Sequence, residues 1–395
     1  MVAAWRLSTA GESHGKALVA VVAGPPAGLS LTAADIDRDL SRRQQGYGRG
    51  GRMAIERDRC EILAGVRHGR TLGSPVALLV PNRDWPNWTE IMSPGPVAEV
   101  SALTGRGAPS RRPRPGHADL AGALKYGHGD LRNVLERASA RSTAAVVAAG
   151  AVARRFLAEF GVACGSCVTA IGGVKASAGP VTPERLALAD DSPLRCLDPA
   201  AEAEMKRRID QARVAGDTLG GVFEVWVFGL PPGLGTYVTP EGRLDGRLAG
   251  AVMAIPAIKG VEFGDGFALA ATPGSRAHDP ILPGLRRASN HAGGLEGGMT
   301  NGEPLVLRAA MKPIATLGQP LPTVDLDTGE AVPADFHRSD VCAVPAAAVV
   351  AEAQVLLVLA DAFAAKFGGD SLPEVRRAYD SYREEVQRWA KPTSS

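Results

Sequence analysis

The sequence is short of lysine, of aromatic residues and of net charge. Only eight of its 44 basic residues are lysine, aromatic residues make up 5% of the 395 positions, and the formal net charge is +2. Proteins that bind polyanions such as nucleic acid usually carry a much larger basic excess. The composition therefore argues against a general nucleic-acid-binding surface, and any anion site must come from a local cluster of charge.

Cysteine is also scarce. The five cysteines are Cys60, Cys164, Cys167, Cys196 and Cys342. The pair 164/167 has the spacing of a redox or zinc motif, but no second pair and no nearby histidine completes such a site. We therefore expect reduced, structural thiols in a cytosolic protein, and no metal site.

Long hydrophobic runs and targeting segments are missing. Residues 1–9 contain no apolar core of a signal peptide. The longest apolar stretch, 346–359, carries Glu352 and Gln354, and it is shorter than the ~20 residues that a membrane span needs. The expectation is a cytoplasmic protein that does not contact a membrane. Nucleotide-binding signatures are missing too, because no P-loop is present and no Gly-x-Gly-x-x-Gly run follows a strand.

Glycine and arginine are abundant instead. Glycine takes 47 positions and gathers beside polar residues at 11–15, 115–119 and 293–298, where it lets the backbone approach a ligand. Between Arg42 and Arg59, six arginines surround the glycine-rich run 46–52. Arginine binds carboxylates and phosphates through forked hydrogen bonds. The loop predicts a small substrate carrying both groups; the alternative, an RNA-binding Arg-Gly-Gly segment, normally needs repeated copies, and this chain has one.

The pattern of apolar residues predicts a mixed fold. Runs bounded by glycine or proline indicate strands at 17–23, 76–80, 222–228 and 305–307. A capping box at Thr32 and Asp35 opens a helix that runs to about Gln45. Further helices are expected at 142–160, 200–215 and 345–367, the first and last of them buried. Strands mixed with helices indicate an α+β or layered α/β architecture. Length alone predicts two or three domains.

Two histidines are the best candidates for chemistry. His14 and His117 both lie in glycine-flanked turns, and histidine titrates near neutrality. Either one alone is as easily a hydrogen-bonded turn residue, but two in the same setting beside an arginine cluster indicate catalysis. Weaker signals come from hydroxyls at 136–143 before a buried helix, from 312–316, and from Asp340 beside an arginine. Four other histidines lack this double context, and we take them as structural or supporting residues: His68, His128, His278 and His291.

Taken in order, these segments resemble the chorismate synthase family nearly end to end. The matching segments are 10–15, 46–52, 69–75, 114–119, 136–143, 258–262, 290–302, 311–313 and 338–344. The resemblance implies an α+β fold, a single-domain β-α-β sandwich with buried helices between antiparallel sheets. Residues 1–395 would form one catalytic domain, contrary to the length argument, and the assembly would be a homotetramer.

The resemblance also implies an activity, that of a carbon–oxygen lyase acting on phosphate. Members of the family convert 5-enolpyruvylshikimate-3-phosphate into chorismate and phosphate by a 1,4-anti elimination. This is the last step of the shikimate pathway, towards the aromatic amino acids. The reaction needs reduced FMN although no net redox change occurs. In this reading NADP(H) acts only as an indirect reductant of the flavin. The alternative from another enzyme class is an NADPH-dependent flavin oxidoreductase.

Family roles carry over to matching positions of this chain. By similarity, His14 would protonate the departing phosphate, His117 would face the flavin N1 edge, and Asp340 with Ser13 would relay a proton at flavin N5. The expected substrate ligands are Arg43, Arg49, Arg52 and Arg338. The expected flavin contacts are Arg137, Ala138, Ser139, Pro256, Ala257, Gly297, Lys312, Pro313, Ile314, Ala315, Thr316 and Arg338, with NADP near Arg43 and Arg49.

Overall fold

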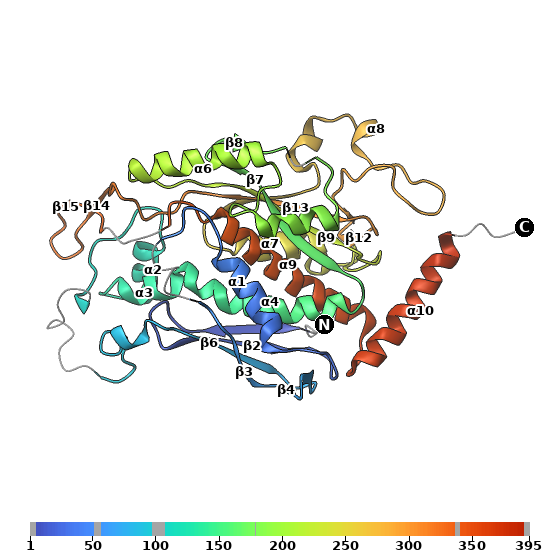
Figure 1. The fold of residues 1–395 in the computed structure, drawn as a ribbon, viewed down its shortest axis with the longest axis horizontal. Helices are drawn as coiled ribbons and strands as arrows, with labels where there is room; N and C mark the ends of the chain where they lie inside the picture. Colours follow the sequence, from blue (N-terminus) through green and yellow to red (C-terminus); the bar gives the residue numbers. More distant parts are fainter. Residues whose placement is uncertain (1–4, 51–56, 97–106, 178, 336–339, 391–395) are drawn as a thin grey trace, which may run out of the picture.

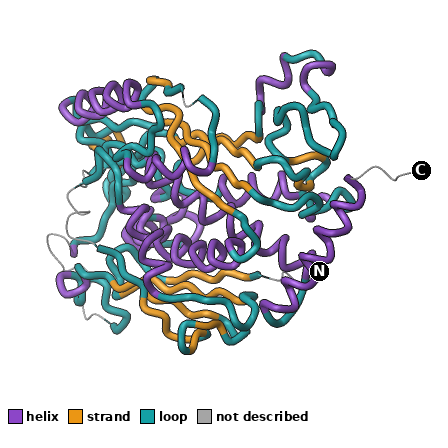
Figure 2. The backbone as a smooth tube through the Cα atoms, turned by 45° about the vertical axis from the view of Figure 1, so that its right-hand side comes forward, coloured by secondary structure: helices purple, strands orange, loops and turns teal. Residues whose placement is uncertain are grey.

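The chain folds into three layers, in which helices lie between two antiparallel sheets (Figure 1). The computed structural model describes residues 5–50, 57–96, 107–177, 179–335 and 340–390. Figure 2, in which helices are purple and strands orange, shows the helical layer between the two sets of strands. The predicted β-α-β sandwich of the α+β class is confirmed.

A four-stranded sheet forms one outer layer, with the order β1-β2-β6-β3. Its strands are β1 (Arg6–Ala10), β2 (Ala17–Ala23), β6 (Val76–Pro81) and β3 (Glu61–Ala64). Side chains alternate between the two faces of a strand, and in β2 Leu18 and Val22 are buried against the helices while Val21 points outward. The strands predicted at 17–23 and 76–80 are confirmed.

A five-stranded sheet forms the other outer layer, with the order β10-β13-β9-β7-β8. Its strands are β10 (Ile258–Phe263), β13 (Leu305–Met311), β9 (Gly221–Phe228), β7 (Ala163–Ile171) and β8 (Val174–Lys175). The predicted strands 222–228 and 305–307 are confirmed, and β13 extends further, to Met311. The remaining strands form two-stranded hairpins: β4 (Val66–Arg67), β5 (Arg70–Thr71), β11 (Leu295–Glu296), β12 (Met299–Thr300), β14 (Pro322–Val324) and β15 (Ala331–Pro333).

Three helices fill the space between the sheets, and all three were predicted. They are α1 (Ala33–Gln44), α4 (Thr143–Ala158) and α9 (Val344–Phe367). The other helices are α2 (Asp119–Tyr126), α3 (Arg132–Ala138), α5 (Pro183–Ala187), α6 (Pro199–Val214), α7 (Leu244–Met253), α8 (Gly274–Ala277) and α10 (Leu372–Ala390). One buried apolar cluster includes side chains from both sheets and from α1, α4 and α9.

The predicted capping box starts α1. The Thr32 hydroxyl accepts a hydrogen bond from the Asp35 amide at 3.4 Å, and the Asp35 carboxylate accepts one from the Thr32 amide at 2.9 Å. The last turn of α1 carries Arg42 and Arg43. Because neighbouring residues of a helix point in different directions, these two arginines reach different parts of the molecule.

Arg42 enters a buried ionic network centred on Glu352 of α9. The Glu352 carboxylate is fully buried and accepts hydrogen bonds from Arg42 at 2.8 and 2.9 Å and from Arg154 of α4 at 2.6 Å. Ser166 of β7 donates at 2.6 Å, and Arg195 lies at 3.4 Å. Burial opposes ionisation of Glu352, but the three arginines outweigh it and hold its pKa well below the usual range. The network ties α1, α4 and α9 to the five-stranded sheet.

Helices α4 and α9 cross very closely beside this network. A Cβ atom placed on Gly150 of α4 would lie 2.6 Å from the Cα of Ala353 on α9. Real atoms of this kind do not approach so closely, so the crossing requires glycine at this position. The close crossing places Arg154 next to Glu352.

Helix α9 agrees with the helix predicted at 345–367 and extends beyond the apolar stretch 346–359 at both ends. It spans 24 residues and is long and apolar enough to cross a membrane by length and composition alone. However, 78% of its most apolar 18-residue segment is buried inside the protein. The burial identifies α9 as the central helix of the core.

Candidate active site

A cavity of about 830 Å³ contains most of the predicted functional residues. Its predicted members are Ser13, His14, His117, Ala138, Ser139, Pro256, Ala257, Lys312, Ile314, Ala315, Thr316 and Asp340. They come from the loop between β1 and β2, the turn before α2, the end of α3, the turn before β10, the segment after β13 and the residues before α9. This volume is typical of a site for small molecules.

His14 is held by a buried carboxylate and an aromatic ring. Its Nδ1 lies 2.9 Å from Oε1 of Glu136, and its backbone amide donates to Oε2 of the same side chain at 2.8 Å. Glu136 is only 2% exposed. The Trp88 ring stacks on the imidazole, with the ring centroids 3.8 Å apart and an angle of 26° between the planes. The Nδ1 edge and one face of the His14 imidazole are therefore both held by protein groups.

His117 is held in a similar way by Asp119 at the start of α2. Its Nδ1 lies 2.5 Å from Oδ1 of Asp119, which is 2% exposed. The Arg114 guanidinium donates to the same carboxylate at 2.8 Å and to the Thr316 hydroxyl at 3.1 Å. Burial opposes ionisation of Asp119, but the hydrogen bonds from His117 and Arg114 outweigh it and hold its pKa well below the usual range. The carboxylate therefore stays ionised beside the imidazole.

Asp340 connects the cavity to the glycine- and arginine-rich loop. Its Oδ1 accepts a hydrogen bond from the Gly50 amide at 2.7 Å, and its Oδ2 lies 3.3 Å from Nε of Arg49. The Val341 amide donates to the Gly48 carbonyl at 2.8 Å. Nearby, burial raises the pKa of the Cys342 thiol to about 11, so this thiol stays protonated at neutral pH. All five cysteines are free thiols.

Ser13 is the second residue of the predicted proton relay. It is 3% exposed, and its hydroxyl accepts a hydrogen bond from Ser139 at 3.2 Å. Its amide donates to the Glu136 carbonyl at 2.9 Å. Ser13 and Asp340 thus line the same cavity, each through its own set of contacts.

One wall of the cavity contains a strained turn. Ala257, which precedes β10, has a φ of 68°, a conformation that non-glycine residues rarely adopt. Its carbonyl accepts a hydrogen bond from the Lys312 amide at 2.9 Å, and the Lys312 ammonium donates to the Gly116 carbonyl at 2.8 Å. Such strain persists where the surroundings over-determine it, often at binding sites. Pro313 belongs to the same segment but does not line the cavity.

Several predicted residues lie elsewhere in the described structure. Arg43 is 6% exposed, and it donates to the Thr143 hydroxyl and to the carbonyl of the cavity-lining Ala140, both at 2.9 Å. Arg137 donates to the Gly11 carbonyl at 3.1 Å, outside the cavity. Gly297, with a φ of 59°, forms the turn of the β11–β12 hairpin and does not line the cavity. The predicted Arg52 and Arg338 lie outside the described residues.

The sequence prediction missed the partners of the two histidines. Glu136 and Asp119 lay inside matching segments, but nothing in their spacing indicated a bond to a histidine. Trp88 gave no signal, because it follows His14 by many residues and meets it only in the fold. Arg132 also lines the cavity, and it approaches both the Trp88 ring, at 5.7 Å, and Glu136, at 3.7 Å.

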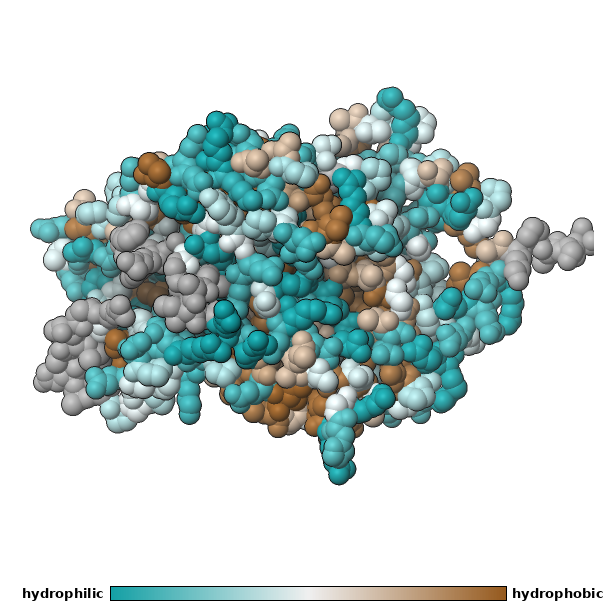
Figure 3. Space-filling model, in the orientation of Figure 1, coloured by the Kyte–Doolittle hydropathy of each residue, from teal (hydrophilic) through white to brown (hydrophobic). Residues whose placement is uncertain are grey.

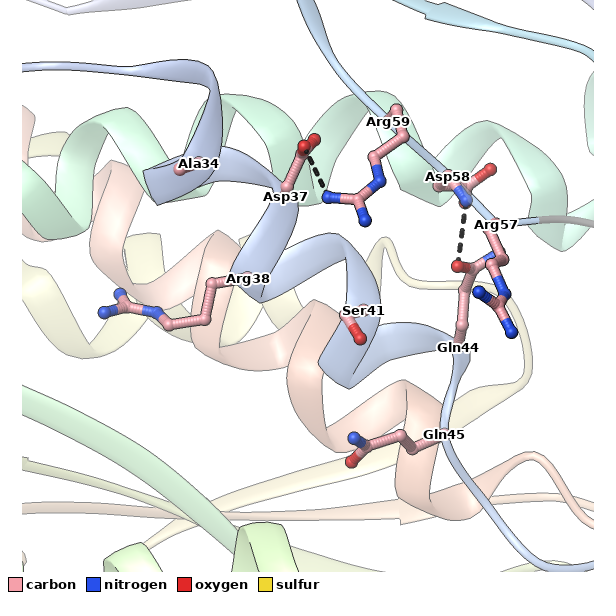
Figure 4. Close-up of a pocket in the computed structure, with 9 residues that line it drawn as sticks. All are labelled: Ala34, Asp37, Arg38, Ser41, Gln44, Gln45, Arg57, Asp58 and Arg59. Atoms are coloured by element: carbon pink, nitrogen blue, oxygen red, sulfur yellow. Dashed lines mark hydrogen bonds and ion pairs between the residues drawn. The ribbon is translucent and has the colours of Figure 1, made fainter.

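Figure 4 shows a second pocket, between α1 and residues 57–59. Two of its charged side chains, Arg59 and Asp37, pair with each other at 2.9 Å, whereas Asp58 pairs with Arg141 outside the pocket. The Asp58 amide donates to the Gln44 side chain at 2.9 Å. None of the predicted catalytic residues lines this pocket. Within the described residues, no group of three or more His, Cys, Asp or Glu side chains could hold a metal ion.

Comparison with known proteins agrees with this geometry. The family model for chorismate synthase matches residues 5–364. A chorismate synthase from Symbiobacterium thermophilum is 57% identical over 389 residues, covering 97% of this chain and 100% of the relative. One from Moorella thermoacetica is 58% identical over 386 residues, covering 97% and 99%. A crystal structure of chorismate synthase superimposes with a TM-score of 0.78 at 42% identity, covering 97% of this chain and 98% of the other.

Proposed function

This chain belongs to the chorismate synthase family, and on that premise we propose how its cavity carries out the family's reaction. The reaction is the 1,4-anti elimination of phosphate from 5-enolpyruvylshikimate-3-phosphate, which makes the enzyme a carbon–oxygen lyase. One C–H and one C–O bond break, one C=C bond forms, and a proton and phosphate leave. The observation that carries the proposal is the convergence of His14, His117 and Asp340 on one cavity.

His14 is the proposed proton donor to the departing phosphate. A leaving oxygen that develops negative charge needs a proton or a fixed positive charge beside it. The imidazole lines the cavity, and its plane and its Nδ1 edge are both held by protein groups. Asp340 and Ser13 are proposed to hold and move the proton that the substrate loses on its other side. Asp340 suits this task because it is partly exposed to the cavity, at 21%.

Arginines are proposed to bind the two carboxylates and the phosphate of the substrate. Arg49, Arg52 and Arg338 are assigned this role together with Arg43. Support comes from the contact between Arg49 and Asp340, which brings a cation to the edge of the cavity. Arg43 adds positive charge beside the wall at Ala140, to which it donates a hydrogen bond. Arginine keeps its charge when it is desolvated, which favours it over lysine here.

The same cavity fits the reduced flavin that the family requires. A fused ring needs apolar walls and a few polar groups at its edges. Leu135, Met311 and Ile314 offer apolar surface, while Lys312 and Thr316 offer a cation and a hydroxyl. We assign FMN as the flavin, held by 138–139, 256–257 and 312–316, with His117 at its edge. When bound, reduced flavin supplies an electron-rich ring that stabilises an electron-poor reacting centre.

Four assigned flavin contacts, Arg137, Gly297, Pro313 and Arg338, rest on the family resemblance alone. Arg137 and Gly297 lie away from the cavity of this single chain. NADP(H) is proposed only as an indirect reductant of the flavin, near Arg43 and Arg49. The rival function, an NADPH-dependent flavin oxidoreductase, is not favoured by the comparisons.

An anaerobic assay tests the proposal. Purified protein is mixed with 5-enolpyruvylshikimate-3-phosphate and chemically reduced FMN, and chorismate and phosphate are followed together. We expect both products in equal amounts, with no net oxidation of the flavin. The control contains oxidised FMN and should give no product.

Absence of product from folded, flavin-binding protein would overturn the lyase assignment. A separate mixture of protein, oxidised FMN and NADPH tests the rival function. Rapid bleaching of the flavin by NADPH, without any chorismate in the first assay, would move the oxidoreductase to first place.

A homotetramer is the proposed assembly, and the outer face of the four-stranded sheet supports it. Outward-facing positions of an antiparallel sheet at a protein surface are usually polar. Here Val19 opposes Leu79 on this face, Val21 opposes Ala77, and Leu63 is 56% exposed. Figure 3 shows apolar surface gathered along the lower side of the molecule, where this sheet lies in Figure 1. An apolar face of this kind is typical of a subunit interface.

Residues 1–395 are proposed to form a single catalytic domain in the cytoplasm. The single-domain assignment draws on the buried apolar cluster shared by both sheets and the central helices. The compartment follows from the expected reduced thiols and from the pathway's small-molecule substrate. No nucleic acid or membrane partner is proposed.

A further inference from the structure

Both oxygens of the buried Glu136 carboxylate contact His14. The His14 backbone amide donates to Oε2 of Glu136 at 2.8 Å, and Nδ1 lies 2.9 Å from Oε1 and 3.0 Å from Oε2. An ionised carboxylate only accepts hydrogen bonds. Next to an ionised Glu136, Nδ1 must therefore carry a proton to make this contact, whatever the charge of the ring.

This bond decides which ring atom can exchange a proton. With Nδ1 pinned in its protonated form, only Nε2 changes between donor and acceptor as the ring gains or loses its charge. A rotation of the ring by 180° would carry Nδ1 away from Glu136, and the Trp88 ring stacked at 3.8 Å holds the plane against it. Trp88 is itself anchored, because its indole N–H donates to Asp84 at 2.8 Å.

We infer that Glu136 is a positioning residue for the elimination, which fixes His14 in the Nδ1–H tautomer so that Nε2 is the atom that protonates the leaving phosphate. The inference rests on the proposed role of His14. It assigns to Glu136 a task that its burial alone does not suggest, since a buried glutamate could simply join a structural ion pair. His117 also has its Nδ1 beside a carboxylate, that of Asp119, but its backbone amide donates to Arg114 instead.

Replacing Glu136 by glutamine makes the inference testable, because glutamine has one acceptor and one donor where glutamate has two acceptors. If the amide oxygen accepts the His14 backbone N–H, the amide NH₂ faces Nδ1 and drives the ring proton to Nε2. In E136Q the tautomer of His14 should therefore change while the side chain keeps its size. Glu159→Gln is the matched control, since Glu159 is also paired with an arginine but lies outside the cavity.

The first readout needs no cofactor and no turnover. The ring nitrogens of protein labelled with ¹⁵N-histidine are observed by NMR without ligands, and the His14 signals are assigned by their loss in His14→Asn. We expect the neutral ring to carry its proton on Nδ1 in the parent and in E159Q, and on Nε2 in E136Q. A parent ring in the Nε2–H tautomer would overturn the inference.

The second readout is the division between kcat and KM. In E136Q we expect kcat to fall at least about 100-fold, the loss typical of a misplaced acid–base group, with KM within about threefold of the parent. E136D keeps the charge and both acceptors, so it should recover at least about tenfold of that loss. Folded, flavin-binding E136Q with kcat within about threefold of the parent would also overturn the inference.

The two readouts separate this inference from the proposed function. If the parent protein makes no chorismate but His14 carries its proton on Nδ1, the lyase assignment fails and the tautomer assignment stands. If E136Q does not fold, the tautomer of the parent and the kinetics of E136D still decide the question.

Discussion

Glu352 and Glu136 are both withdrawn from solvent, at 0% and 2% exposure, yet they have different partners. Glu352 is surrounded by three arginines and a serine hydroxyl. Glu136 holds a histidine that lines the cavity. Arginine does not release its proton under ordinary conditions, whereas histidine does so near neutral pH.

The difference shows how one kind of buried carboxylate yields either structure or chemistry. Among arginines, Glu352 completes a closed set of charges that connects helices α1, α4 and α9 with β7. Beside His14, Glu136 leaves one ring atom able to exchange a proton. The partner therefore decides the role of the carboxylate, and each side of this contrast can be tested.

The largest effect should come from removing the histidine itself. His14→Ala is expected to lower kcat by about 100- to 10,000-fold, the usual contribution of a general acid. Flavin binding should be largely kept, because the flavin-facing segments do not depend on His14. Asp340→Ala should behave alike. Turnover is measured with reduced FMN, and flavin affinity by fluorescence.

The histidine side of the contrast would fail in two ways. Full activity of either variant would remove that residue from the mechanism. A loss of folding free energy in His14→Ala as large as that expected for Glu352→Gln would show that the Glu136 pair is structural as well.

The next largest effect is expected at Glu352. Glu352→Gln removes the central negative charge and leaves three arginines without it, one of them the buried Arg195, so it should lower the unfolding free energy by about 3–5 kcal/mol. Urea unfolding measures this loss. The kcat of the folded variant should stay close to that of the parent, because the network does not line the cavity. A Glu352→Gln variant that is fully stable but inactive would show that Glu352 serves the reaction rather than the fold.

Ser166→Ala should lower the unfolding free energy by a smaller amount. This change removes one donor, at 2.6 Å, from a fully buried carboxylate and leaves the arginines in place. A hydrogen bond to a charged group contributes about 1.5–3 kcal/mol. Urea unfolding should show a loss in that range, and Ser139→Ala, which alters an uncharged hydroxyl pair, should cost less. Equal losses would mean that the charge of Glu352 adds nothing.

The smallest effect is a dependence on pH. The pKa of Glu352 is depressed in the folded protein, so its contribution is present above the ordinary value near 4.5 and is lost as the pH falls. The difference in unfolding free energy between the parent and Glu352→Gln should therefore narrow by about 1.4 kcal/mol per pH unit below that value. Unfolding curves between pH 7 and pH 3 measure it. A constant difference would contradict the depressed pKa.

Local patterns predicted several elements well, whereas the order of the layers came from the family resemblance. Runs bounded by glycine or proline located β2 and β6, and the capping box at Thr32 located the start of α1. The helices α4 and α9 were recognisable from their nearly continuous apolar composition. These signals lie within one element each, so they do not depend on the rest of the fold.

The site was predictable only in part, because its contacts join distant segments. Motifs identified His14, His117 and Asp340, but not the carboxylates that hold the histidines; Glu136 lies 122 positions from His14. The residue pattern placed Arg42 and Arg43 together at the end of one helix, and only the family resemblance assigned a role to Arg43. In the structure one meets Glu352 and the other Thr143, since a helix turns neighbouring side chains in different directions.

The position of α9 in the chain has a consequence for synthesis. A ribosome that has made residues 1–343 has made every described strand of both sheets, but not α9, the last of the three helices that lie between them. Until α9 follows, its neighbours expose apolar surface of the kind that chaperones bind. The core of this enzyme is therefore completed only after all the strands around it have been made, and truncation before Val344 should yield insoluble chains rather than a smaller folded protein.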